Sequence, residues 1–208
     1  MMQRTRIKFC GITRIEDLEI AVDLGVDAIG FVFCPASPRA IDVQQACTLI
    51  ERCGPFITSV GLFMDQDAGT INSIIDQVPV DMLQFHGQES EPFCCSFGRP
   101  YLKSIAMGGD GQAVSKSDYA SAAGLLLDSN ELGQPGGSGK QFNWQNVPAV
   151  DRPIILAGGL DSSNVNDAIR QVRPYAVDVS SGIESAKGIK EFNKMKNFVS
   201  SVRDADEC

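Results

Sequence analysis

Short apolar segments alternate along the chain with longer segments whose apolar residues recur every three or four positions. The short segments are rich in β-branched and aromatic residues, as strands are, and the longer ones have the spacing of amphipathic helices. The predicted strands are Ile7–Cys10, Ala28–Phe33, Ile57–Phe63, Met82–His86, Tyr101–Ala106, Leu125–Asp128, Ile154–Ala157 and Ala176–Val179. They begin about 24 residues apart on average, which suits one strand and one crossover helix.

Residues that favour helix ends support this alternation. Thr13 with Glu16 forms a capping-box pattern, and Gly25 stands where the first helix is predicted to end. Asp42 and Asp67 precede the next two apolar stripes as caps. The fourth to sixth helices are predicted to be short. The last two have these stripes: Val165, Ala168, Ile169 and Val172, then Ile189, Phe192, Met195, Phe198, Val199 and Val202.

Eight strand–helix units with strands apolar on both faces favour an α/β fold, a single closed parallel (β/α)8 TIM barrel. An open, doubly wound sheet is the alternative. No linker or low-complexity tract divides the chain, so residues 1–208 are predicted to form one domain.

Charge and cysteine content narrow the possible functions. The chain of 208 residues has 18 Lys and Arg against 26 Asp and Glu, and its net charge of −8 disfavours nucleic acid and acidic membranes as partners. The basic segment Met1–Lys8 has no apolar stretch after it, so no signal peptide is expected. Seven cysteines without a C-x-x-C pair, and one histidine, predict a reducing cytoplasm and no metal site.

Polar residues gather where the predicted strands end, which is where barrels of this kind carry their active sites. Cys10 ends the first strand on the same face as Lys8, and a nearby ammonium group favours a thiolate that can act as a base. The alternative for Cys10 is a buried core thiol. Other possible lining residues at this rim are Gln84, His86 and Asp178.

Two further residues carry candidate chemistry. Asp128 ends an otherwise apolar strand, where a partly desolvated carboxyl group has a raised pKa and can donate a proton. It could instead cap the following loop. Arg39 follows the second strand and could bind a carboxylate through two hydrogen bonds, or simply be a solvated loop residue. His86 could be a base, although a hydrogen-bonded lining role is the commoner one.

Three glycine-rich segments are candidates for a phosphate site: Gly136–Gly139, Gly158–Gly159 and Ser180–Gly182. Glycines let the backbone approach a ligand closely, and the last two segments precede predicted helices, whose N-termini favour anions. The loops after strands 7 and 8 are the usual phosphate site of this fold. Each segment alone could equally be a turn.

These motifs resemble, in order and over essentially the whole chain, those of the phosphoribosylanthranilate isomerase family. The motifs that carry the resemblance are Lys8–Thr13, Ser37–Arg39, Gln84–Gly87, Leu127–Ser129, Gly136–Gly139, Leu156–Leu160 and Asp178–Glu184. Phe9 stands where the family commonly has Ile, on the strand face away from Cys10.

The resemblance implies an Amadori rearrangement in tryptophan biosynthesis, from N-(5′-phosphoribosyl)anthranilate to 1-(o-carboxyphenylamino)-1-deoxyribulose 5-phosphate. It implies no cofactor or metal, Cys10 as general base, Asp128 as general acid and Arg39 on the anthranilate carboxylate. The sequence does not fix the oligomeric state, and a monomer or homodimer is expected. The phosphate-binding residues that it implies are Gly137, Ser138, Gly139, Gly158, Gly159, Ser180, Ser181 and Gly182.

Two alternatives stay open at this point. One is another phosphate-binding barrel enzyme, such as the ProFAR isomerase of histidine biosynthesis or indole-glycerol-phosphate synthase. The first of these uses a pair of aspartates, whereas this chain has Cys10 on its first strand. The other alternative is a regulator that binds a phosphosugar without turning it over.

Overall fold

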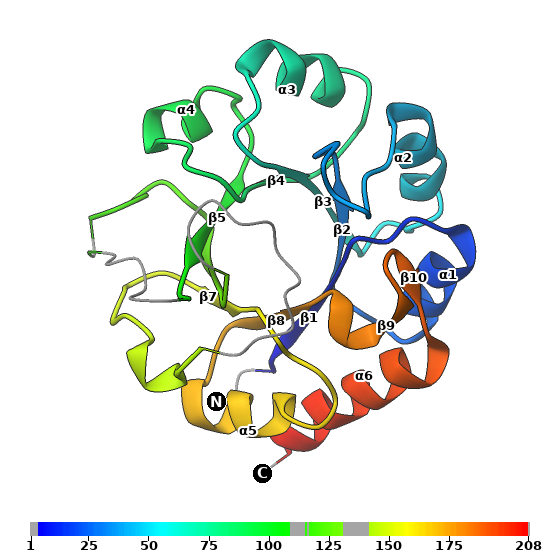
Figure 1. The fold of residues 1–208 in the computed structure, drawn as a ribbon, viewed down its shortest axis with the longest axis vertical. Helices are drawn as coiled ribbons and strands as arrows, with labels where there is room; N and C mark the ends of the chain where they lie inside the picture. Colours follow the sequence, from blue (N-terminus) through cyan, green and yellow to red (C-terminus); the bar gives the residue numbers. More distant parts are fainter. Residues whose placement is uncertain (1–3, 109–114, 116, 131–141, 208) are drawn as a thin grey trace.

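Eight parallel strands form a closed barrel in the computed structural model, which describes residues 4–108, 115, 117–130 and 142–207. The strands follow one another in chain order, and β8 pairs with β1 to close the ring (Figure 1). Their bounds are β1 Arg6–Cys10, β2 Ala28–Val32, β3 Thr58–Phe63, β4 Met82–Phe85, β5 Tyr101–Ala106, β6 Gly124–Asp128, β7 Ile154–Leu156 and β8 Ala176–Val179. The predicted barrel is confirmed, and the open sheet is excluded.

Helices surround the barrel on its outside (Figure 1). Their bounds are α1 Ile15–Asp23, α2 Val43–Ile50, α3 Ala68–Ile75, α4 Glu91–Cys95, α5 Val165–Val172 and α6 Phe192–Asp206, with 3₁₀ turns η1 Trp144–Asn146 and η2 Ser181–Ile183. Within these described segments, no helix combines the length and the apolar character needed to cross a membrane.

Two of the three predicted helix caps are confirmed. The side chain of Asp42 accepts a hydrogen bond from the backbone of Gln45, and Asp67 does the same for Thr70. Such caps satisfy backbone N–H groups that have no partner within the helix. The capping box at Thr13 is wrong, because α1 begins after Arg14 and the Thr13 hydroxyl donates instead to the carbonyl of Gly188.

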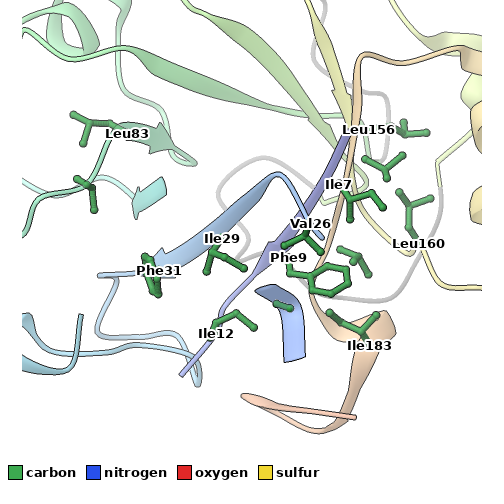
Figure 2. Packing of buried hydrophobic residues seen from close by; sticks show 14 of the residues in the cluster. Ile7, Phe9, Ile12, Val26, Ile29, Phe31, Leu83, Leu156, Leu160 and Ile183 are labelled. Carbon is green, nitrogen blue, oxygen red and sulfur yellow. The ribbon is translucent and has the colours of Figure 1, made fainter. Parts of the chain in front are cut away.

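The main hydrophobic core lies between the barrel and its helices. Phe9, Phe31, Phe63 and Phe85 point outward from the first four strands and are fully buried. Figure 2 shows Ile7, Val26, Leu160 and Ile183 around the Phe9 side chain, whose ring also packs edge-on against Phe198. Each buried aromatic side chain stabilises the fold by roughly 1.5–3 kcal/mol.

The barrel interior holds a much smaller apolar cluster, and this leaves room for polar chemistry. The cluster consists of Leu102, Leu126, Ile155, Ala157 and Ala176, with Met82 packed against it. Alternate residues of a strand point to opposite faces. The inward positions closer to the carboxyl ends of the strands are therefore left to the polar residues of the candidate site.

The segment between β8 and α6 differs from its prediction. Ile189, predicted to lie in the last helix, belongs instead to a short antiparallel hairpin of β9 (Glu184–Ala186) and β10 (Ile189–Lys190). Phe192 begins α6 but is half exposed. A three-residue 3₁₀ turn therefore follows Ser180 directly, and a full helix begins only after the hairpin.

Candidate active site

The predicted lining residues meet inside the barrel. Lys8 and Cys10 from β1, Gln84 from β4, Asp128 from β6 and Asp178 from β8 are all buried. All five stand at inward positions of their strands, because the two-residue repeat of a strand brings alternate side chains to one face. The structure thus unites residues that lie up to 170 positions apart in the sequence.

Lys8 and Asp178 form an ion pair at the centre of this ring. They stand opposite each other on neighbouring strands, and Lys8 Nζ donates to Asp178 Oδ1 at 2.9 Å. Burial works against the charged ammonium group, but Asp178 and Cys10 outweigh it and raise the pKa of Lys8. Lys8 is therefore a fixed positive charge beside the Cys10 sulfur.

Cys10 does not have the readily formed thiolate that the sequence suggested. Its side chain is 6% exposed, and burial raises the pKa of the Cys10 thiol above its ordinary value. Lys8 and Lys190 act in the opposite direction, while Asp178 adds to the effect of burial. Proximity to one ammonium group is thus outweighed by desolvation of the sulfur.

Gly30 is a site residue that the sequence reasoning missed. It pairs in register with Cys10, and a Cβ atom at Gly30 would lie 2.8 Å from Cys10 Sγ and 3.1 Å from Lys8 Nζ. These distances are shorter than normal van der Waals contacts. A glycine at an inward strand position could have indicated this close approach.

Asp128 has the properties of a proton donor near neutral pH. It is 7% exposed, and burial raises the pKa of its carboxyl group to about 6, although a hydrogen bond from the backbone of Asn130 works against the shift. This bond also means that Asp128 begins the following loop as a local cap. Asp128 therefore has both the raised pKa and the loop-capping hydrogen bond that were expected as alternatives.

His86 lies next to Asp128. Its Nε2 is 3.8 Å from Asp128 Oδ2, and its Nδ1 is 3.4 Å from the side-chain nitrogen of Gln84. Burial lowers the pKa of His86 to about 4, so the imidazole is neutral at pH 7. A neutral ring can exchange hydrogen bonds with a bound ligand without adding a charge to the site.

Arg39 is held by a partner that the sequence did not reveal. The side chain is buried, and its Nε and Nη2 donate to the two carboxylate oxygens of Glu184 at 2.7 and 2.8 Å. Nη1 takes no part in this pair. The solvated alternative for Arg39 is excluded, and any ligand carboxylate would have to share the guanidinium group with Glu184.

Two of the three predicted phosphate loops lie side by side. Gly158 and Gly159 have left-handed backbone angles, with φ of +80° and +64°, and a Cβ atom at Gly158 would collide with Ser129. A Cβ atom at Gly182 would collide with the carbonyl of Leu160, so the loops after β7 and β8 touch. Gly137, Ser138 and Gly139 lie outside the described residues.

The arrangement is suited to proton transfer on a molecule with two anionic ends. Asp128 can donate a proton, and Cys10 can accept one once ionised. Arg39 and the paired glycine loops provide donors for two separate anions. In the part of the chain that the structure describes, no group of three or more His, Cys, Asp or Glu side chains is placed to hold a metal ion.

Comparison with known proteins points to one family. A family model described as N-(5′-phosphoribosyl)anthranilate (PRA) isomerase matches residues 7–201. The N-(5′-phosphoribosyl)anthranilate isomerase of Pseudomonas fluorescens (strain Pf0-1) is 50% identical over 204 residues, which are 97% of this chain and 100% of that protein.

Solved structures agree with this result. The phosphoribosyl anthranilate isomerase of Thermus thermophilus superposes with a TM-score of 0.86 at 32% identity, covering 96% of this chain and 99% of the other. Another such isomerase, in complex with reduced 1-(o-carboxyphenylamino)-1-deoxyribulose 5-phosphate, gives a TM-score of 0.79 at 32% identity, with the same coverage of both chains.

Proposed function

Because the chain belongs to the N-(5′-phosphoribosyl)anthranilate isomerase family, we propose that Asp128 and Cys10 are the general acid and general base of its reaction. The enzyme converts N-(5′-phosphoribosyl)anthranilate to 1-(o-carboxyphenylamino)-1-deoxyribulose 5-phosphate, a step of tryptophan biosynthesis. A relative that shares 32% of its residues with this chain binds a reduced form of this product.

The reaction needs one proton donor and one proton acceptor. Asp128 gives its proton to the ring oxygen of the ribose, the bond from that oxygen to C1′ breaks, and a protonated imine forms. The Cys10 thiolate removes the proton from C2′, and the electron pair of that C–H bond moves to form an enolamine. The enolamine then tautomerises to the ketone, so the reaction is an isomerisation without a net change in composition.

The observation that carries this assignment is the pKa of Asp128. Burial of Asp128 raises its pKa to about 6, so a substantial fraction of the carboxyl group, about one tenth, still carries its proton at pH 7 and can donate it. Cys10 is mostly a thiol at that pH, because burial raises its pKa. Its ionised form, stabilised by Lys8 and Lys190, is a correspondingly strong base.

Substrate positioning follows from the anions at the two ends of the molecule. We assign the anthranilate carboxylate to Arg39, whose Nη1 lies outside the pair with Glu184. The residues assigned to the phosphate are Gly158, Gly159, Ser180, Ser181 and Gly182, together with Gly137, Ser138 and Gly139 from the sequence. Lys8, Gln84, His86 and Asp178 line the space between these ends. Fixing both ends holds the ribose between acid and base.

Turnover of freshly made phosphoribosylanthranilate, followed by fluorescence, tests these roles. Wild type should consume the substrate, and Cys10→Ser and Asp128→Asn should each lose most of their rate, since general acid–base catalysis is worth about 10²–10⁴-fold. Cys95→Ser is the matched control, because Cys95 is exposed on α4. Full activity of Asp128→Asn would disprove the assignment of the acid while leaving the family unchanged.

The same proposal covers assembly and location. Residues 1–208 form a single barrel domain, and the protein is a monomer or homodimer. It binds a small phosphorylated substrate and neither nucleic acid nor membrane. The net charge of −8 supports the expected absence of polyanionic partners. The free thiols of Cys34 and Cys95 at accessible positions suit a reducing cytoplasm. Light scattering coupled to size-exclusion chromatography measures the assembly directly.

A further inference from the structure

The hairpin of β9 and β10 is fixed against the start of α1. The backbone nitrogen of Lys190 donates to Asp17 Oδ2 at 3.0 Å, and the hydroxyl of Thr13 donates to the carbonyl of Gly188 at 2.7 Å. Asp17 is in turn held by two hydrogen bonds from Arg14, at 2.7 and 3.1 Å. Figure 1 shows β9 and β10 beside α1 and α6, next to the end of β1. The hairpin is therefore a fixed support beside the site.

Lys190 connects the hairpin to the strand that carries the base. Its ammonium group, buried with 4% of the residue exposed, donates to the carbonyl of Cys10 at 2.7 Å and to the carbonyl of Ser180 at 3.2 Å. It also donates to Glu184 Oε1 at 2.8 Å. An ammonium group has three donors, and these three oxygens can use all of them. Lys190 thus joins the end of β1 to the loop after β8.

Glu184 continues this connection to Arg39. Its carboxylate lies between Lys190 and the guanidinium group of Arg39, which donates to both of its oxygens. Burial opposes ionisation of Glu184, but the two cations outweigh it and lower its pKa. The stem of Arg39 also rests against Gly11, where a Cβ atom would be 2.5 Å from Arg39 Cδ. The guanidinium group is therefore fixed both at its head and along its stem.

A buried ion pair of this kind gives little net stability, because desolvation offsets most of the Coulomb attraction. Its main effect is to fix the positions of the side chains and loops that it connects. One chain of contacts runs from Arg39 through Glu184 and Lys190 to the backbone of Cys10 and Ser180. Glu184 and Lys190 thereby connect the residues proposed to bind the carboxylate (Arg39), to act as the base (Cys10) and to bind the phosphate (Ser180).

We propose that Glu184 and Lys190 are positioning residues of the isomerase, with Glu184 orienting Arg39 and Lys190 holding Cys10 and the Ser180 loop in register. This inference rests on the proposed roles of Cys10 and Arg39. Loss of the two residues should have different kinetic effects. Loss of Glu184 affects the grip on the substrate carboxylate, whereas loss of Lys190 affects the base and the phosphate loop.

Lys190→Met tests the role of Lys190, because it removes the charge while keeping an unbranched apolar side chain. We expect kcat/KM to fall about 10- to 100-fold, because small misplacements at an active site have effects of this size. Alkylation of Cys10 by iodoacetamide, followed by peptide mass, should become slower at each pH. The charged groups that face Cys10 are Lys8, Asp178, Lys190 and Arg39, and the variant removes one cation from them.

The alkylation readout separates positioning from a merely structural role. If Lys190 only supported the fold, its loss would loosen the site, expose Cys10 and make alkylation faster. Faster alkylation, or an unchanged rate together with an unchanged kcat/KM, would overturn the inference for Lys190. Lys187→Met is the matched control, because Lys187 is exposed in the turn of the same hairpin and its loss removes the same charge. It should behave as wild type in both measurements.

Glu184→Gln tests the role of Glu184 in orienting Arg39. A neutral amide still accepts hydrogen bonds but no longer fixes Arg39 through two charged oxygens. KM for phosphoribosylanthranilate should rise about 10-fold or more, with a smaller change in kcat, since a weaker carboxylate grip loosens substrate and transition state alike. A fall in kcat at unchanged KM would mean a smaller active fraction and would overturn the role of Glu184.

The proposed role of Cys10 and the proposed positioning roles of Glu184 and Lys190 can fail separately. If Cys10→Ser turned over substrate at the wild-type rate, Cys10 would not be the general base, and the part of the inference that concerns Lys190 would fail with it. Inactive Cys10→Ser together with unchanged Lys190→Met and Glu184→Gln would leave the proposed function intact and overturn only the positioning pair.

Discussion

Gly30 on β2 lies opposite Cys10 on β1, so close that a methyl group on Gly30 would lie 2.8 Å from the Cys10 sulfur. The same methyl group would lie 3.1 Å from Lys8 Nζ. The position of the Cys10 sulfur therefore depends on the absence of a side chain at Gly30 of the neighbouring strand. It depends equally on Lys8, whose ammonium group is held by Asp178.

Gly30→Ala should lower activity without unfolding the barrel. The added methyl group must displace the Cys10 sulfur or the Lys8 ammonium group, and we expect kcat/KM to fall about 10- to 100-fold. Steady-state kinetics and far-UV circular dichroism check both parts of this expectation. Gly69→Ala, on the exposed side of α3, is the control and should keep full activity. Equal rates for Gly30→Ala and wild type would contradict the crowding at Cys10.

Asp128 and His86 should make opposite contributions to the pH dependence of stability. The pKa of Asp128 is about 6 in the folded state, above its ordinary value, so the folded state gains a proton first and becomes more stable as pH falls from 6 to 4. The pKa of His86 is about 4, below its ordinary value, so the unfolded state gains a proton first and stability decreases from pH 6.5 to 4. In wild type the two effects largely cancel.

Asp128→Asn removes one side of this balance. Relative to wild type, its free energy of unfolding should drop by about 2–3 kcal/mol between pH 6.5 and 4, because a shift of one pKa unit corresponds to about 1.4 kcal/mol. Urea unfolding at several pH values measures the difference. His86→Asn should show the opposite trend and become more stable than wild type as pH falls. Identical pH profiles for all three proteins would show that neither group has a shifted pKa.

Lys103 and Glu89 form a further buried ion pair, which lies outside the barrel lumen. Lys103 Nζ donates to Glu89 Oε2 at 3.0 Å and to the carbonyl of Gly87, and its side chain is 1% exposed. Lys103→Met leaves the buried carboxylate without its cation and should destabilise the protein by about 3–5 kcal/mol.

Chemical denaturation measures this loss, and the double variant Lys103→Met/Glu89→Gln is its internal control. Neutralising both groups removes the unpaired charge, so the double variant should be more stable than the single one. If the double variant were the less stable of the two, the loss in Lys103→Met would come from packing and not from an unpaired carboxylate.

Gly182→Ala should weaken phosphate binding. A Cβ atom at this position would collide with the carbonyl of Leu160 and push apart the loops after β7 and β8. KM should rise about 10-fold or more, and inorganic phosphate should become a weaker competitive inhibitor by a similar factor, because the phosphate lies in the proposed site between these loops. Unchanged inhibition by phosphate would place the anion elsewhere.

Much of the fold follows from local features of the sequence. Each observed barrel strand begins and ends within one residue of its predicted bounds, because short apolar β-rich runs favour strands that are buried on both faces. The inward direction of Cys10 and Lys8 follows from the two-residue repeat of a strand. Asp128 was recognisable as a carboxyl group at the end of an apolar strand. None of these inferences needed a contact between distant residues.

The electrostatic state and the support of the site depend on contacts that only the folded chain creates. Arg39 and Glu184 are 145 positions apart, and Lys190 is 180 positions from Cys10. No local pattern marks such pairs. Sequence spacing placed an ammonium group beside Cys10 correctly, yet the pKa of the thiol is raised, because the extent of burial decides it. The sequence alone determined which groups face the barrel interior. Tertiary structure decided their charge and their partners, since desolvation and long-range ion pairs arise only when the barrel closes.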